Sequence, residues 1–211
     1  MNPYLAELND FTFTRLARLL ADVSPPAGLK PINLSIGEPK HPTPQFIRDA
    51  IGQNTAGLAQ YPPTKGPLAL RQTIADWIKR RFHLPALDAE TQVLPVLGTK
   101  EALYSFTQTI IDPTRQRPTV LVPNPFYMVY EGAALLCGAK PFFVNFDAAS
   151  GEYAWDAVPQ SVWQDVQLLI VCSPDNPTGA ITNRERWRWL FEQSDRYGFV
   201  IAADECYSEI Y

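Results

Sequence analysis

Short, continuously apolar segments alternate with helix-like segments through most of this chain, and that alternation limits the possible fold more than any other feature. The apolar segments lack the strict polar and apolar alternation of a strand that has one face in water. Helices should therefore cover both faces of each predicted strand, which is typical of a mostly parallel sheet. The sequence predicts an α/β fold of this kind. The predicted strands are residues 93–97, 119–122, 140–146, 167–172 and 199–203.

Predicted helices fill the spaces between these strands. The clearest covers residues 184–197, because Asn183 can cap its first turn and Gly198 can end it. Two further helices are expected at residues 99–111 and around residues 128–137.

The first part of the chain precedes the sheet. Apolar residues at helical spacing over Leu5–Leu20 predict an N-terminal helical arm, which the Pro25-Pro26 pair ends. Thr43-Pro44 predicts the start of a short helix with its apolar residues inward, and an amphipathic helix is expected from Pro67. We therefore predict two regions: residues 1–66 as arm and approach loops, and residues 67–211 as the sheet domain.

The composition is that of a globular chain, with 211 residues, 46% hydrophobic residues and a net charge of -4. Basic residues are scattered apart from Lys79-Arg80-Arg81, which argues against a nucleic-acid partner. The N-terminus lacks a secretory pattern and no apolar run reaches membrane-spanning length, so we expect no membrane partner. The three cysteines form no close pair and the two histidines lie far apart. We expect reduced thiols, a cytoplasmic protein and no metal site.

Two segments carry the strongest chemical signal, Ser173–Gly179 and Asp204–Tyr207. Asp204 follows the last predicted strand, and ligands of open α/β sheets bind beyond the carboxyl ends of the strands. A carboxylate buried there needs a cationic partner, and a protonated pyridine nitrogen would serve. Such a pairing would make the ring an electron sink. The alternative is an Asp that only caps the next turn.

Asn176 and Tyr207 favour the first interpretation, because both can donate a hydrogen bond to a phenolate oxygen on such a ring. Asn176 stands between Pro174 and Pro177, which restrict the loop to few conformations. The alternative is a simple turn, since Asn-Pro and Thr-Gly are common turn pairs.

Two other segments would complete a cofactor site. Gly98-Thr99-Lys100 lies between a predicted strand and a predicted helix, where backbone N–H groups and a hydroxyl can hold a phosphate. By itself this pattern is more often a capped turn. Tyr127 follows another strand and could stack on a flat ring, although an aromatic residue there is more often part of a core.

Taken in order along the chain, these segments resemble the aminotransferase class I and II family, the pyridoxal-phosphate enzymes of fold type I. A single match of this kind would be weak, but six in the family's order are specific. The matching segments are Ile36–Pro39, Tyr61 with Gly66 and Leu70-Arg71, Gly98–Ala102, Pro125–Tyr127, Ser173–Gly179 and Asp204–Tyr207.

The resemblance implies pyridoxal 5'-phosphate (PLP) as the cofactor and an amino acid and a keto acid as substrates. It implies that Asp204 pairs with the pyridine nitrogen, that Asn176 and Tyr207 bond the ring oxygen, and that Tyr127 stacks on the ring. By the same resemblance Gly98, Thr99 and Lys100 surround the phosphate. Tyr61 would reach the phosphate of a partner subunit's cofactor, so a homodimer is expected. Gly37 would lie against the substrate carboxylate.

Longer strings, such as Leu34–Pro44, Pro123–Tyr127 and Asp204–Tyr211, resemble the succinyl-diaminopimelate aminotransferases of bacterial lysine biosynthesis. This subgroup resemblance implies amino transfer between glutamate and N-succinyl-2-amino-6-ketopimelate. Lys40 and His41 follow the Gly37 segment and could receive an acidic substituent of the substrate, or could simply solvate the loop.

The resemblance also implies that the family's Schiff-base lysine lies beyond Tyr211 and that the arginine for the substrate carboxylate lies later still. We therefore expect a large domain that is incomplete, no catalytic residue within the chain, and no turnover by the chain alone. In the family, residues 1–66 would form part of the small domain. The alternatives are another fold type I PLP enzyme, such as a C–S lyase or decarboxylase, and a non-catalytic or degenerate PLP-binding module.

Overall fold

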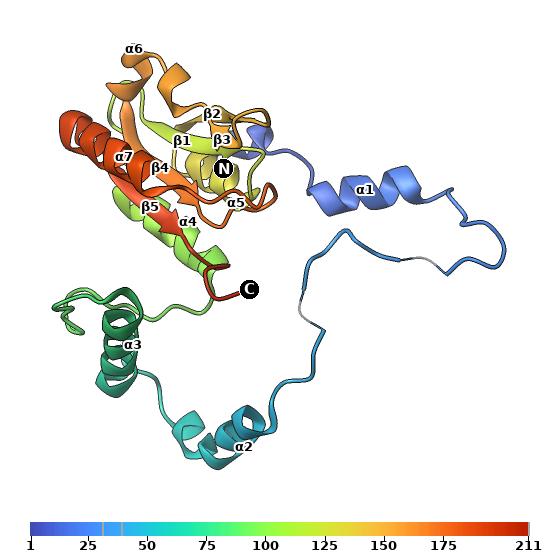
Figure 1. Ribbon diagram of the computed structural model, residues 1–211, viewed down its shortest axis with the longest axis vertical. Helices are drawn as coiled ribbons and strands as arrows, with labels where there is room; N and C mark the ends of the chain where they lie inside the picture. Colours follow the sequence, from blue (N-terminus) through green and yellow to red (C-terminus); the bar gives the residue numbers. More distant parts are fainter. Residues whose placement is uncertain (31, 39, 211) are drawn as a thin grey trace. The chain divides into compact units, whose positions relative to one another are not determined.

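The computed structural model describes residues 1–30, 32–38 and 40–210 (Figure 1). It divides into two compact units. The first combines Met1–Leu8 with the chain from Val96 onward, and the second is Asn9–Pro95. The predicted boundary between residues 66 and 67 falls inside the second unit, and the domain division of the whole protein stays a prediction.

A five-stranded sheet forms the centre of the first unit, in the order β3-β2-β1-β4-β5. Strands β2, β1, β4 and β5 run parallel, and only the short β3 is antiparallel to its neighbour β2. The predicted α/β fold with a mostly parallel sheet is confirmed. The strand bounds are β1 Thr119–Asn124, β2 Lys140–Asp147, β3 Glu152–Tyr153, β4 Val166–Cys172 and β5 Val200–Asp204.

The prediction of a strand at residues 93–97 was wrong. These residues are irregular and take no place in the sheet that the structure describes. Val96 and Leu97 are exposed, and no strand in the described part of the chain pairs with this apolar run. An apolar run becomes a strand only where a partner accepts its backbone hydrogen bonds.

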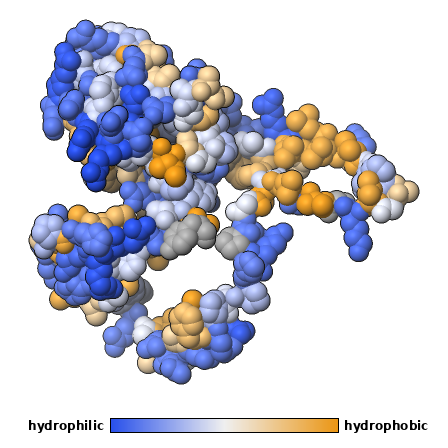
Figure 2. Space-filling view, viewed as in Figure 1, coloured by the Kyte–Doolittle hydropathy of each residue, from blue (hydrophilic) through white to orange (hydrophobic). Residues whose placement is uncertain are grey.

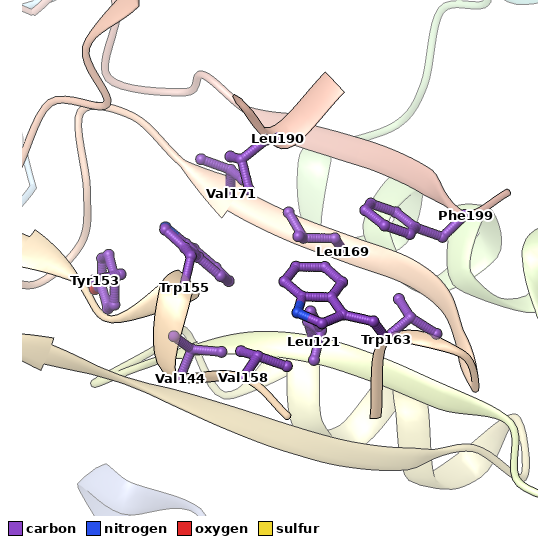
Figure 3. Close-up of a cluster of buried hydrophobic side chains, with 11 residues drawn as sticks. Leu121, Val144, Tyr153, Trp155, Val158, Trp163, Leu169, Val171, Leu190 and Phe199 are labelled. Atoms are coloured by element: carbon purple, nitrogen blue, oxygen red, sulfur yellow. The ribbon is translucent and has the colours of Figure 1, made fainter. Parts of the chain in front are cut away.

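Helices cover both faces of the sheet (Figure 1), because successive side chains of each strand point to opposite faces. On one face, Val120 and Ile170 pack with Tyr130 of α5. On the other, Leu121 and Leu169 pack with Trp163. Figure 3 shows this second cluster, in which Trp155 and Trp163 fill the space between the sheet and α7. The central strands therefore pack against two cores, which explains why their middle residues are apolar on both faces.

The helices of the first unit begin and end where local sequence signals place them. The α7 N-terminus is capped by Asn183, whose side-chain oxygen accepts the Arg186 N–H at 2.8 Å, and Gly198 ends the helix in the left-handed conformation. The helices are α4 Thr99–Ile110, α5 Val129–Leu136, α6 Gln160–Trp163 and α7 Arg184–Tyr197, with 3₁₀ turns η1 Pro3–Glu7 and η3 Trp155–Ala157.

The second unit contains helices joined by irregular chain. In α3, the buried Arg71 donates to the Ala89 carbonyl at 2.6 Å and pairs with Glu90 at 2.9 Å, which holds the segment after the helix against it. The helices are α1 Thr12–Leu20, α2 Gln45–Gln53 and α3 Leu68–Phe82, with a 3₁₀ turn η2 Thr55–Ala59.

The predicted N-terminal arm is helical but is divided, since residues 8–11 separate η1 from α1. Figure 2 shows hydrophobic side chains gathered on α1 and on the chain after it, and Phe11 and Leu19 are among those exposed. The prediction that the apolar residues of α2 face inward was wrong within this unit, because Phe46 and Ile51 are exposed among its described residues.

Candidate cofactor site

The candidate site lies at the carboxyl edge of the sheet, inside the first unit. Asp204 is the last residue of β5 and is in register with Cys172, the last residue of β4. The chain leaves β4 directly into the Ser173–Gly179 loop, and the Ser173 N–H donates to the Asp204 carbonyl at 3.1 Å. Parallel pairing therefore brings together the two segments that carry the strongest sequence signal.

A cavity of about 180 Å³ opens at this edge. Of the predicted cofactor residues, five line it together: Thr99, Tyr127, Asn176, Asp204 and Tyr207. They come from the N-terminus of α4, from the β1–α5 and β4–α7 loops, and from the end of β5. This volume is below the roughly 300–1,000 Å³ of pockets for drug-sized ligands, which suits a small ring.

Asp204 is buried and is held by a residue that the sequence did not single out. The Tyr130 phenol of α5 donates to Asp204 Oδ2 at 2.7 Å, and the Cys206 N–H donates to Oδ1 at 3.3 Å. Within the described part of the chain, no lysine, arginine or histidine pairs with this carboxylate. A buried carboxylate with only neutral donors can receive a cation from a ligand.

The phenols and thiols around Asp204 are neutral at pH 7. Burial, then the hydrogen bond to Asp204 and its charge, raise the pKa of Tyr130 well above its usual value. Cys206 is exposed as a residue, but partial burial of its thiol and the Asp204 charge raise the pKa of that thiol to about 12. Burial also raises the pKa of the Cys172 thiol.

The predicted phosphate turn precedes a helix as expected, but irregular chain rather than a strand leads into it. Gly98 precedes α4 with a φ of 136°, a conformation that other residues rarely adopt, and a Cβ there would lie 2.9 Å from the Glu101 carboxylate. Thr99 opens the helix and faces the cavity, whereas Lys100 is exposed and does not line it. The helix N-terminus and the Thr99 hydroxyl can receive an anion; the Lys100 role stays a prediction.

The remaining predicted residues belong to the second unit. Tyr61, Gly37, Lys40 and His41 are all exposed there, and their roles toward a partner's phosphate or a substrate stay predictions. Pro39 and Tyr211, which form part of the segments that carry the resemblance, lie outside the described residues.

Two larger cavities lie in the first unit. One, of about 560 Å³ between α4 and β5, shares Thr99, Asp204 and Cys206 with the candidate site and extends it along the β5 edge. The other, of about 640 Å³, is lined by Thr119 and Lys140 at the opposite ends of the strands, away from the predicted site residues. In the residues that the structure describes, no group of three or more metal-ligating side chains is present, and no helix is long and apolar enough to cross a membrane.

Sequence reasoning missed Tyr130. Its partner Asp204 lies 74 residues away along the chain, so no local pattern links them. The available signal was its place three residues after Tyr127, which puts both rings near the start of one helix; they meet edge to face with centroids 5.8 Å apart.

Replacing Tyr130 with Phe is expected to lower the free energy of unfolding by about 1.5–3 kcal/mol, because it removes a hydrogen bond to a buried charged group. Urea denaturation at pH 7 without any ligand measures this. Tyr104→Phe, on the exposed side of α4, is the matched control and should change stability by less than about 0.5 kcal/mol. Equal effects of the two variants would show that the Tyr130 contact contributes nothing.

Known proteins share the sequence pattern and the fold of this chain. The sequence profile of the aminotransferase class I and II family matches residues 30–211. Similar curated proteins include the LL-diaminopimelate aminotransferases of Desulforudis audaxviator, 33% identical over 210 residues, and of Moorella thermoacetica, 31% identical over 209 residues. Each alignment covers 98% of this chain and 52% of the relative, so the chain spans about half the length of the curated relatives that it matches.

Solved structures give the same result. An aminotransferase from Neisseria meningitidis is 45% identical with a TM-score of 0.94, and the match covers 100% of this chain and 54% of that one. Aminotransferase AspB from Helicobacter pylori is 33% identical with a TM-score of 0.88, over 97% of this chain and 53% of that one. Profile, relatives and structures agree, and the chain belongs to the aminotransferase class I and II family.

Proposed function

We propose that this chain supplies the non-covalent binding site for PLP in an aminotransferase. Enzymes of the class I and II family depend on PLP. The observation that carries the proposal is the cavity at the carboxyl edge, where Asp204, Asn176, Tyr207, Thr99 and Tyr127 converge from separate elements. The buried Asp204 carboxylate, which pairs with no lysine, arginine or histidine among the described residues, fits the positively charged nitrogen of a pyridine ring.

Each residue has a role that follows from its chemistry. Bound PLP supplies an electron-withdrawing ring, which is the source of its reactivity. Asp204 would hold the ring nitrogen in its protonated form, and Tyr130 keeps that carboxylate oriented through its 2.7 Å hydrogen bond. Asn176 and Tyr207 can donate to the ring oxygen. Tyr127 offers a ring face, and Thr99 offers a hydroxyl to the phosphate at the α4 N-terminus.

The reaction of the whole protein is also a proposal. We infer amino transfer between an amino acid and a keto acid, with glutamate and a diaminopimelate-type compound of lysine biosynthesis as the pair. The names of the curated relatives support this class, and N-succinyl-2-amino-6-ketopimelate is the specific acceptor proposed. A cytoplasmic homodimer, in which Tyr61 reaches the partner's cofactor and Gly37 the substrate carboxylate, completes the proposal; the free state of all three cysteines supports the location.

Titration with PLP tests whether this binding site exists. We expect saturable binding, followed by absorbance and by quenching of tryptophan fluorescence. No lysine is among the described residues that line the cavity. Borohydride treatment of the chain should therefore fix no pyridoxyl group at a unique lysine, and the chain alone should show no transaminase turnover. A lack of saturable binding would refute the proposed PLP-binding site. A single modified lysine together with turnover would refute the proposal that the chain binds PLP without a covalent bond.

The substrate is tested separately, in the active protein that contains this chain. Amino transfer to 2-oxoglutarate should be faster from N-succinyl-LL-diaminopimelate than from LL-diaminopimelate at equal concentrations. The opposite order would replace the succinylated substrate with the one that the relatives' names give.

A further inference from the structure

Beside the cavity, a buried phenol and a buried carboxylate form a pair that the cofactor roles above do not use. Tyr153 of β3 donates to Asp175 Oδ2 at 2.8 Å, and both residues are buried. Neither residue lines the candidate cofactor cavity. Burial of a carboxylate is costly, so the local structure must hold it by specific hydrogen bonds.

Asp175 uses one oxygen for all of these bonds. Besides the phenol, Oδ2 accepts the Thr178 N–H at 3.1 Å and the Thr178 hydroxyl at 2.5 Å. Its backbone is tied as well, since the Asp175 N–H donates to Ala180 and its carbonyl accepts from Gly179. The second oxygen, Oδ1, is buried without a hydrogen-bond partner in the structure as described. The carboxylate therefore depends on the Tyr153 and Thr178 donors to offset its burial.

The same phenol reaches a second loop. Tyr153 Oη lies 3.2 Å from the Pro125 carbonyl, in the loop that carries Tyr127 into the cavity. A phenol has one proton, and the shorter bond to a charged acceptor is the stronger of the two. Asp175 directly precedes Asn176. One oxygen atom thus touches both the Tyr127 loop and the Asn176 loop.

The Tyr153 ring is itself fixed. It packs against Phe146 with centroids 5.3 Å apart and against Trp155 at 5.8 Å, in the core cluster on the α7 face of the sheet. Burial, and then the hydrogen bond and charge of Asp175, keep the pKa of the phenol above its usual range. The phenol is therefore neutral and its ring is held in place by packing, so it can fix the positions of the two loops that it contacts.

We propose that the Tyr153–Asp175 pair positions the cofactor residues, by fixing the distance between the loop that presents Tyr127 and the loop that presents Asn176. Both are positioning residues and touch no cofactor atom. This inference rests on the proposed function, because the cavity between the two loops is the proposed PLP-binding site. Without the pair, the two loops lose the contact that they share. The Tyr127 ring and the Asn176 amide then no longer keep a fixed distance from each other.

The test compares Tyr153→Phe with Tyr197→Phe. Tyr197 belongs to the same core cluster, where its ring stacks on Trp163 at 6.0 Å, away from both loops. We expect Tyr153→Phe to raise the Kd for PLP about tenfold, because binding must then also order the side chains of the two loops, while Tyr197→Phe keeps it within about twofold. Equal Kd values for the two variants would overturn the inference. Absence of PLP binding by the wild type would instead refute the proposed function.

Hydrogen exchange on the cofactor-free protein gives a readout that needs no ligand. In Tyr153→Phe, amides in both segments 123–128 and 173–180 should exchange faster than in wild type, whereas Tyr197→Phe should leave them unchanged. Faster exchange in only one segment, or in neither, would contradict a shared anchor.

A double-variant cycle tests whether the pair acts as a unit. Asp175→Ala removes the stronger of the two acceptors for the phenol and breaks the link between the loops, so adding Tyr153→Phe should weaken PLP binding by less than about twofold further. Independent, multiplying losses in the double variant would show that the two residues act separately.

Discussion

Replacing Asp204 with Asn is expected to raise the Kd for PLP by about tenfold to a hundredfold, the largest effect of any single change in the site. The substitution keeps the side chain's size and leaves an oxygen to accept the Tyr130 phenol, but it removes the negative charge. Hydrogen bonds to charged groups contribute about 1.5–3 kcal/mol, and this one would join a carboxylate to a protonated ring nitrogen in a buried position. Equilibrium dialysis at fixed ionic strength measures the change.

Glu205→Gln is the matched control, because it removes the same charge from the neighbouring, exposed residue. It should change the Kd by less than about twofold, since exposed charges are screened by solvent and salt. If Asp204→Asn bound PLP as tightly as Glu205→Gln, Asp204 could not be the partner of the ring nitrogen.

Replacing Trp163 with Ala is expected to lower the free energy of unfolding by about 3–5 kcal/mol, the range for large aromatic residues in cores. Trp163 is 4% exposed and contacts three other rings, Trp189, Tyr197 and Phe199, at centroid distances of 5.9, 6.0 and 5.5 Å. Its removal would leave a cavity between the sheet and α7, visible in Figure 3 as the space that the indole fills. Urea denaturation followed by far-UV circular dichroism measures the loss.

Trp77→Ala serves as the comparison, because it removes the same side chain from α3 where 42% of Trp77 is exposed. Its effect on the second unit should stay below about 2 kcal/mol, since much of its surface is already in water. A Trp163→Ala loss no larger than this would show that the α7 face is not a tightly packed core.

The sheet could be predicted because its central strands are buried on both faces. Leu121 and Leu169 point to one core and Val120 to the other, so consecutive residues in the middle of these strands are apolar and the pattern stands out. The same signal misled at residues 93–97, where apolar residues meet no neighbouring strand. Strand β3 has two residues and pairs antiparallel at the sheet edge, too short to leave a periodic pattern.

Part of the site could also be predicted from the sequence. Asp204, Asn176 and Tyr207 were predicted to lie together because they follow the strands that carry them, and the parallel pairing of β4 with β5 brings them to one cavity. The residues that hold them were not predicted. Tyr130 and Tyr153 act through contacts 74 and 22 residues away along the chain, and such pairs appear only when the elements pack.

The central claim is that Asp204 holds a protonated pyridine ring in the cavity at the carboxyl edge of the sheet. The most direct measurement is ¹⁵N NMR of PLP labelled at the ring nitrogen and bound to the chain at neutral pH. We expect the chemical shift of a protonated pyridine in wild type, and movement toward the unprotonated shift in Asp204→Asn. An unprotonated ring nitrogen in the wild-type complex would contradict it.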